Sequence, residues 1–352
     1  SNPHAIFEQQ DPAWVDQAAA QAMPKWWQRA FRQADDIFME GATWANGHRP
    51  SLLVLMFHGL FRNKAEALAE DVDPYQPFTE RDLCLLIEHF QRQGYHFIAP
   101  EKMHDGLRAA PKRLLLTFDD GYANNLRALP ILRRYGVPAT FFVTAGNVAS
   151  GEAFWWDAVY RHMASRGIGH PTIVAERQRL KAMPVKAIRS TLTSMFGRNA
   201  LMPAGDTDRP LTLPELAELA GEPLVTIGNH SVDHELLTRV PRREVRYQIE
   251  RSQDMLEQWI GYRPMVIAYP NGNCNEAVLE IARRAGLRVG LTAEPGKSAL
   301  PLSADQRMQI PRYAIVGGES LARQLRAAEA PISLSIIKNQ LLHRRRLRAT
   351  LR

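Results

Sequence analysis

The sequence predicts an α/β protein, a distorted (β/α) barrel with an extension at each end. Two patterns predict this fold. Short apolar runs alternate with amphipathic helical segments, as in parallel strands joined by crossover helices. Polar residues able to do chemistry stand where apolar runs end, which is where barrel enzymes place their active sites. With 352 residues and 45% hydrophobic content, the chain can bury one large core.

The expected elements follow along the chain. Strands are expected over residues 51–57, 96–99, 114–118, 138–144, 225–229, 287–292 and 309–315, with a further strand end at 268–272. Helices are expected over 78–93 with Thr79 as the N-cap, then over 123–135, 174–196 and 241–259, and in a last segment that ends at Arg284. These elements indicate one domain over residues 49–316, with an insertion at 158–212 that includes a loop at 197–210.

Two extensions flank this domain. Residues 1–48 carry several tryptophans among polar residues and predict amphipathic helices that cap the domain or meet a partner. Residues 317–352 predict a basic helical tail, and six basic residues between Lys338 and Arg352 account for most of the net charge of +7. Such a helix could lie on an anionic membrane surface, and a solvated basic end is the alternative. Nucleic acid is not an expected partner, because aromatic residues are not interleaved with the basic ones.

Composition also limits the cellular setting. Two cysteines, Cys84 and Cys274, argue against a disulfide framework. No apolar stretch is long enough to span a membrane, and no charged-then-apolar signal segment opens the chain. We therefore expect a cytoplasmic protein that is peripheral to a membrane at most. The alternative is a leader removed ahead of Ser1.

One expected strand, 114–118, ends in Asp119, Asp120 and Gly121. Adjacent ionised carboxylates at the end of a buried strand need a partner, and a cation is one natural choice. The alternative is a turn whose aspartates cap the following helix.

A second expected strand, 225–229, ends at His230, with His234 four residues on. This spacing would place both imidazoles on one face of a helical turn, where they can share a metal. Two histidines and a carboxylate form a hydrolytic zinc set that leaves one position open for water. Solvated surface histidines are the alternative, but the Asp-Asp-Gly strand end in the same chain favours a metal site.

Three further residues attract attention. His58 ends the first strand, where barrel enzymes keep catalytic groups, although most single histidines are satisfied polar residues. Trp155 and Trp156 are expected in a loop. Paired indoles there can stack on sugar rings, and plugging the rim of the barrel is the alternative.

Residues 117–121 and 230–234 resemble the first two motifs of the polysaccharide deacetylases, the NodB homology family that is also carbohydrate esterase family 4. Residues 268–272 are similar to its groove-wall motif, and the likeness covers about residues 51–313. The resemblance implies a NodB-type barrel that removes N-acetyl groups from an amino-sugar polysaccharide or glycan intermediate, releasing acetate. It also implies a divalent cation, Zn²⁺ or one such as Co²⁺ or Ni²⁺. His58 on the first strand resembles the exopolysaccharide-deacetylase branch.

The resemblance further implies roles for individual residues. Asp120, His230 and His234 would hold the metal, Asp119 would be the catalytic base, and His58 would be the general acid. Substrate would meet the turn of Tyr269, Pro270 and Asn271, with the Tyr269 backbone N–H helping to stabilise the oxyanion. If Trp155 and Trp156 stack on sugar rings as described above, they would contact substrate as well.

One motif position departs from the family. Many members carry an arginine in the third motif that orients the catalytic aspartate, and Ala268 or a neighbour stands there in this chain. Two other functions compete with the deacetylase prediction. One is a metalloamidase of the same fold acting on a small non-sugar amide, and the other is a non-catalytic glycan-binding module.

Overall fold

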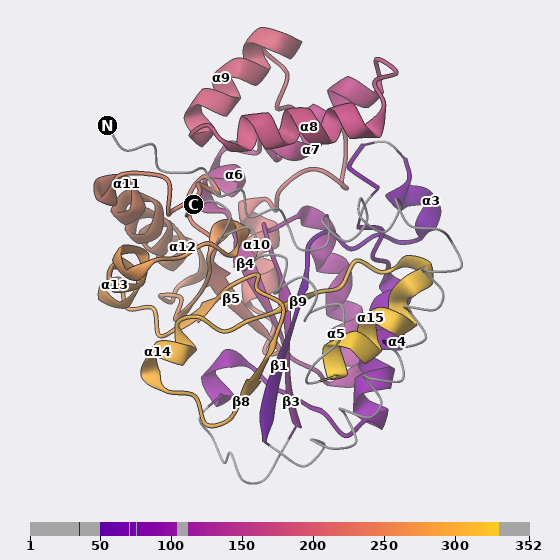
Figure 1. Ribbon diagram of the computed structural model, residues 1–352, viewed down its shortest axis with the longest axis vertical. Coiled ribbons are helices and arrows are strands. Elements are labelled where there is room, and N and C mark those ends of the chain that lie inside the picture. Colours follow the sequence, from indigo (N-terminus) through magenta and orange to yellow (C-terminus); the bar gives the residue numbers. More distant parts are fainter. Residues whose placement is uncertain (1–34, 36–49, 70, 75, 104–111, 331–352) are drawn as a thin grey trace, which may run out of the picture.

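The computed structural model describes residues 35, 50–69, 71–74, 76–103 and 112–330 (Figure 1). The helices predicted over 1–48 and the basic tail beyond residue 330 therefore lie outside the described residues, except for Asp35.

The centre of the molecule is a nine-stranded sheet in which six strands run parallel in the order β7-β6-β5-β4-β3-β1. In chain order the strands are β1 (Ser51–Phe57), β2 (His96–Phe97), β3 (Lys112–Phe118), β4 (Ala139–Val143), β5 (Val225–Asn229), β6 (Val266–Ala268), β7 (Val289–Leu291), β8 (Lys297–Ala299) and β9 (Tyr313–Ala314). Strand β2 pairs with β3, and β8 pairs antiparallel with β1. The sequence does not predict β8.

An irregular segment joins the two edges of this sheet. Ile310 forms a parallel bridge with Leu291 at the end of β7, and Tyr313 in β9 pairs with Leu55 in β1. Residues 310–314 therefore cross the seam between the first and last parallel strands. This is the distorted (β/α) barrel that the sequence predicts.

Both faces of the parallel strands are buried, as expected for strands covered by helices on one side and by a barrel interior on the other. Leu53 and Leu55 pack in the cluster beneath the outer helices, whereas Leu52 and Val54 pack in a second cluster with residues of β6 and β7. Each of these leucines is at most 1% exposed, and burial of such a side chain contributes about 1.5–3 kcal/mol.

The helices of the barrel are α3 (Lys64–Ala67), α4 (Glu80–Arg92), α5 (Ala128–Tyr135), α6 (Ala145–Ser150), α10 (Leu213–Ala220), α11 (Arg242–Arg246), α12 (Ser252–Ile260), α13 (Glu276–Arg284), α14 (Ala304–Arg307) and α15 (Leu321–Glu329). Thr79 caps α4 as predicted, in a capping box with Asp82. The helix predicted over 123–135 begins as a 3₁₀ helix, Ala123–Arg127. A π-helical stretch, Tyr247–Arg251, joins α11 to α12. Shorter 3₁₀ turns are Pro100–Lys102, Pro270–Gly272 and Gly318–Ser320.

Helix α15 belongs to the barrel. Its Leu321 and Leu325 are buried in the main core cluster, which also contains residues of α4. The barrel therefore continues to residue 329, past the boundary predicted at 316. None of the described helices is both long enough and apolar enough to cross a membrane.

The insertion folds as three helices, α7 (Trp155–Ala164), α8 (His170–Lys181) and α9 (Val185–Phe196), around their own apolar cluster. Figure 1 shows them stacked over one end of the sheet. The single helix predicted over 174–196 is wrong. It is two helices, because Pro184 at the N-cap of α9 has no N–H and keeps Met183 out of helical geometry.

Candidate metal centre and catalytic site

The predicted site residues come together at the carboxyl ends of the strands. His58 follows β1, Asp119 and Asp120 follow β3, and His230 and His234 follow β5. All five line one cavity, which the insertion also borders.

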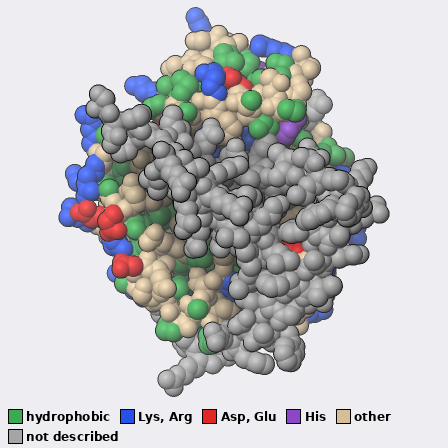
Figure 2. All heavy atoms as spheres, in the orientation of Figure 1, with side chains coloured by type: hydrophobic (Ala, Val, Ile, Leu, Met, Phe, Trp, Pro, Cys, Tyr) green, Lys and Arg blue, Asp and Glu red, His purple; other side chains and the backbone are tan. Residues whose placement is uncertain are grey.

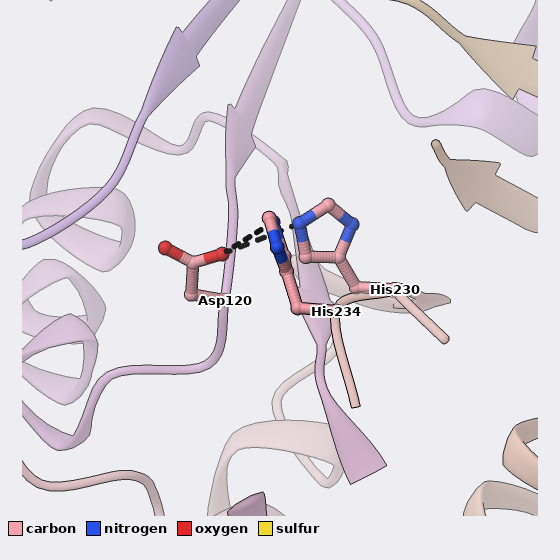
Figure 3. Close-up of side chains that lie close together, drawn as sticks. All are labelled: Asp120, His230 and His234. Atoms are coloured by element: carbon pink, nitrogen blue, oxygen red, sulfur yellow. Dashed lines mark ion pairs between the residues drawn. The ribbon is translucent and has the colours of Figure 1, made fainter. Parts of the chain in front are cut away.

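Asp120, His230 and His234 point toward one another (Figure 3). The Oδ1 atom of Asp120 is 3.3 Å from Nε2 of His230 and 3.5 Å from Nε2 of His234, and one donor atom from each residue lies within 4.8 Å of the others. Asp120 Oδ1 is buried and has no hydrogen-bond partner among the described residues. Two imidazole nitrogens and one orphaned carboxylate oxygen fit a divalent cation such as Zn²⁺.

The backbone at these strand ends adopts an uncommon conformation. Among the described residues the four non-glycines with positive φ are Asp120 at 74°, Ser231 at 65°, His234 at 57° and Asn271 at 57°. Left-handed backbone costs energy outside glycine and tends to occur at functional sites. The helical turn predicted for residues 230–234 is wrong. The two histidines stand on an irregular loop in which Ser231 and His234 have left-handed backbone.

Surrounding groups orient both imidazoles. The Nδ1 atom of His230 lies 2.8 Å from the carbonyl oxygen of Ala268, so an Nδ1–H can donate to it and leave Nε2 free as a ligand. The ring of Trp156 packs on His234 at 4.8 Å between centroids. The Trp156 Nε1–H donates to the Tyr122 hydroxyl, which in turn donates to Asp157 at 2.6 Å.

This contact corrects another expectation. Trp155 and Trp156 form the first turn of helix α7 and do not lie in a loop. Both indoles line the cavity, but Trp156 is committed to His234 and Tyr122. Trp156 therefore packs against a predicted metal ligand besides lining the cavity.

The protonation states suit a cation. Burial acts to raise the pKa of Asp120, but the close approach of the His230 imidazole and the charges of the nearby histidines outweigh it and lower the pKa. Burial together with repulsion from His230 lowers the pKa of His234 to about 3, so its imidazole is neutral. Burial also acts to lower the pKa of His230, but the close approach of the Asp120 carboxylate and the negative charges of Asp119 and Asp120 raise it overall. A positive charge is thus favoured between Asp120 and His230, where a metal ion would sit.

An arginine that the sequence analysis missed holds Asp119. The guanidinium of Arg312 donates from Nη1 to Oδ1 and from Nη2 to Oδ2 of Asp119, both at 2.8 Å. Both side chains are almost fully buried, at 1% and 4% exposure. Burial acts to raise the pKa of Asp119, but the Arg312 charge, with help from His230, outweighs it and lowers the pKa to about 2. Asp119 is therefore an oriented carboxylate.

Arg312 stands in the segment that crosses the barrel seam, immediately before β9. From the segment before the last strand, Arg312 supplies the guanidinium that Ala268 in the third motif cannot supply. The signal in the sequence was one arginine inside the otherwise apolar stretch 310–315, which a buried strand tolerates only with an acidic partner.

We expect Arg312→Met to lower the free energy of unfolding by about 3–5 kcal/mol, because a buried carboxylate loses its counter-charge. The folded pKa of Asp119 lies below its unfolded value, so the ion pair contributes fully at pH 7 and is lost as pH falls from about 4 toward 2. Urea denaturation at pH 7 with a chelator present measures the change.

The double variant Arg312→Met with Asp119→Leu is the matched control. It removes both charges together and should recover most of the lost stability. A single variant as stable as the parent would contradict a stabilising role for the ion pair.

The turn after β6 differs from its predicted role. The Tyr269 backbone N–H donates to the carbonyl of Leu291 at 3.1 Å, continuing the sheet, so it is not available to an oxyanion. The Tyr269 side chain is fully buried, with its hydroxyl bonded to Met308 O. Tyr269 is therefore not placed to contact substrate, and Pro270, the next residue, is also buried. Asn271 is the predicted residue of this turn that lines the cavity.

Comparison with known proteins agrees with this architecture. The chain matches the family model "Polysaccharide deacetylase" over residues 107–290, more than half of its length. A putative polysaccharide deacetylase of Bacillus subtilis, YxkH, is 22% identical over 273 residues, which are 76% of this chain and 72% of that protein.

Two solved structures share the fold. The Streptococcus pyogenes deacetylase PplD, in complex with acetate, superposes with a TM-score of 0.53 at 20% identity, covering 79% of this chain and 97% of that one. IcaB from Ammonifex degensii gives a TM-score of 0.52 at 17% identity, covering 80% and 98%.

The fold is that of the solved deacetylases, and polar groups converge at its strand ends. Together with the family match, this defines a protein of the carbohydrate-deacetylating class. The chain belongs to the polysaccharide deacetylase family. Its curled parallel sheet is the NodB-type barrel that the sequence predicts.

Proposed function

We propose that this protein hydrolyses N-acetyl groups on an amino-sugar-containing polysaccharide or glycan intermediate, with a divalent cation as cofactor and acetate as product. One observation supports this above all: Asp119, clamped by Arg312, shares a cavity with His58 and with the convergent set of Asp120, His230 and His234. The cavity thus combines a fixed carboxylate, a histidine and a cation site, which are the parts that amide hydrolysis needs.

Each residue has a defined task in this proposal. Asp120, His230 and His234 would hold Zn²⁺, with Co²⁺ or Ni²⁺ as alternatives. Such an ion, when bound, lowers the pKa of water and polarises the acetyl carbonyl. Asp119 accepts a proton from the attacking water while the oxygen of that water forms a bond to the acetyl carbon. Arg312 keeps that carboxylate ionised and fixes its direction.

His58 completes the reaction. When the carbon–nitrogen bond breaks, the sugar nitrogen must receive a proton, because an amine anion is a prohibitive leaving group. His58 lines the same cavity, and the side-chain amide of Asn125 donates to the His58 backbone carbonyl at 2.7 Å. Protonated His58 would give the nitrogen that proton, so the products would be acetate and a free amino sugar.

Two features favour this function over the alternatives. A glycan-binding module has no need for an anionic Asp119 fixed by a buried guanidinium. The two indoles beside the cation site offer a sugar ring an apolar surface, which a small non-sugar amide would use less fully.

The first test measures acetate release from a pentamer of N-acetylglucosamine by protein stripped of metal with a chelator and then reloaded. We expect stripping to reduce the rate by about 100-fold or more and Zn²⁺, Co²⁺ or Ni²⁺ to restore it. A loaded protein that hydrolyses only a simple N-acetyl amide would indicate the metalloamidase. Binding of the pentamer with no acetate from either substrate would indicate a binding module.

A further inference from the structure

The three helices of the insertion form a wall of the catalytic cavity. Helix α8 contributes Arg177, Gln178 and Lys181 to the lining, and the strand ends of the barrel contribute the reacting groups. Arg177 and Lys181 are four residues apart, so they share one face of α8, and that face looks into the cavity.

One end of this face is fastened to the segment that follows α3. Arg177 forms an ion pair with Asp73, and the His170 Nε2 atom lies 3.2 Å from the same carboxylate. The Asp73 side chain is only 10% exposed and the Arg177 side chain 20%. Both line the cavity, so their ion pair forms part of its wall.

The other end of the face is fastened to the turn that follows β6. The Lys181 ammonium donates to the side-chain oxygen of Asn271, which is one of the left-handed residues at the strand ends. Both residues line the cavity. The Lys181 carbonyl also accepts from Arg239, which ties the end of α8 to the loop after His234.

These two ties attach to separate segments of the barrel. The first attaches to the chain between β1 and β2, and the second attaches to the turn that follows β6. In the closed sheet, β3, β4 and β5 separate β1 from β6 on one side, and β7 and residues 310–314 separate them on the other. Helix α8 therefore bridges two separate segments at the mouth of the barrel and is held to each. A glycan running through the site would have to pass beneath a helix fixed at each end.

The remaining space is small. The cavity holds about 250 Å³, close to the lower end of the roughly 300–1,000 Å³ usual for small-molecule sites. We infer that the site accepts one N-acetylated sugar at the end of a glycan and excludes the interior units of a long chain. The pairs Arg177–Asp73 and Lys181–Asn271, here called the clasp, determine this specificity. The inference rests on the proposed deacetylase function.

Binding measurements test the clasp without turnover. The Asp119→Asn variant is titrated calorimetrically with N-acetylglucosamine oligomers of one to five units. A pocket for one terminal unit predicts affinities within about threefold from the dimer to the pentamer. Affinity that rises about tenfold or more along this series would show a running groove and would overturn the inference.

The position of cleavage supplies the second test. Parent protein acting on the pentamer should remove the acetyl group of a terminal unit first, as mapped by mass spectrometry of the partly deacetylated product. Asp73→Ala and Lys181→Ala each release one tie and should raise the share of interior deacetylation at least severalfold. The control is Arg179→Ala, which lies on the same helix but is 56% exposed and paired with Glu176, outside the cavity lining.

The outcomes separate the two proposals. If the loaded parent removes interior acetyl groups as fast as terminal ones, the clasp is wrong and the deacetylase stands. If no N-acetylated sugar yields acetate, the proposed deacetylase function is wrong. The affinities from the titration still decide whether the cavity binds one sugar unit or several. A thermal melt of each variant verifies that its helices remain folded.

Discussion

Replacing Asp120 with alanine is expected to yield a folded protein that binds no divalent cation. Asp120 contributes the anionic donor of the set, and its Oδ1 atom is the point closest to both imidazoles. Two neutral histidines alone hold a cation far less tightly than two histidines with a carboxylate. We expect the metal content to fall from one ion per chain to about one tenth or less, with acetate release at least about 1,000-fold lower.

The backbone of residue 120 complicates that variant, and a second substitution resolves the complication. Asp120 has a φ of 74°, where alanine is strained by about 1 kcal/mol or more, whereas asparagine tolerates this region. Asp120→Asn removes the charge and keeps the turn, so it should lose metal with little loss of stability. Asp305→Ala, an 85% exposed carboxylate in an ion pair with Arg283, is the control that should retain full metal content. Unchanged metal in Asp120→Asn, measured by elemental analysis, would reject the ligand assignment.

Replacing Asp119 with asparagine should separate binding of the cation from turnover. An amide cannot take the proton of the attacking water, so we expect kcat to fall by about 100- to 10,000-fold. The three ligands remain, so the metal content should stay at one ion per chain. Some stability should be lost as well, because the Arg312 guanidinium would remain buried without its counter-ion.

Chemical rescue distinguishes a base from a purely structural residue at position 119. In Asp119→Ala, added formate can occupy the vacated space and accept the proton, so it should restore part of the rate in proportion to its concentration. A role limited to holding Arg312 would show recovered stability with formate and no recovered rate. Full activity of Asp119→Asn would remove its role as base altogether.

The convergence of Asp120, His230 and His234 could be predicted from the sequence because each stands next to a strong local signal. Asp120 and His230 follow runs of buried strand residues, and the carboxyl ends of parallel strands meet at one edge of a sheet. The convergence therefore depends mainly on strand order. The local geometry could not be predicted, because left-handed Ser231 and His234 replace the helical turn that the spacing suggests.

Arg312 escaped prediction for a different reason. It lies 193 residues from Asp119 in the chain, and the two meet only where residues 310–314 cross the seam of the barrel. No local pattern encodes that crossing. The prediction that the Tyr269 N–H is available to an oxyanion is also wrong for a reason of pairing between strands. Strands β6 and β7 continue to pair one residue beyond the strand that the apolar run predicts.

The contact between Arg312 and Asp119 has a consequence for how the protein is made. A nascent chain that has emerged only as far as residue 290, where the family match ends, already contains both aspartates and both metal-site histidines. Its reactive carboxylate still lacks the guanidinium that sets its charge and direction. Under the proposed mechanism, hydrolytic competence is therefore withheld until the segment that carries Arg312 docks, and copies of the barrel without that segment would be inert toward the glycan.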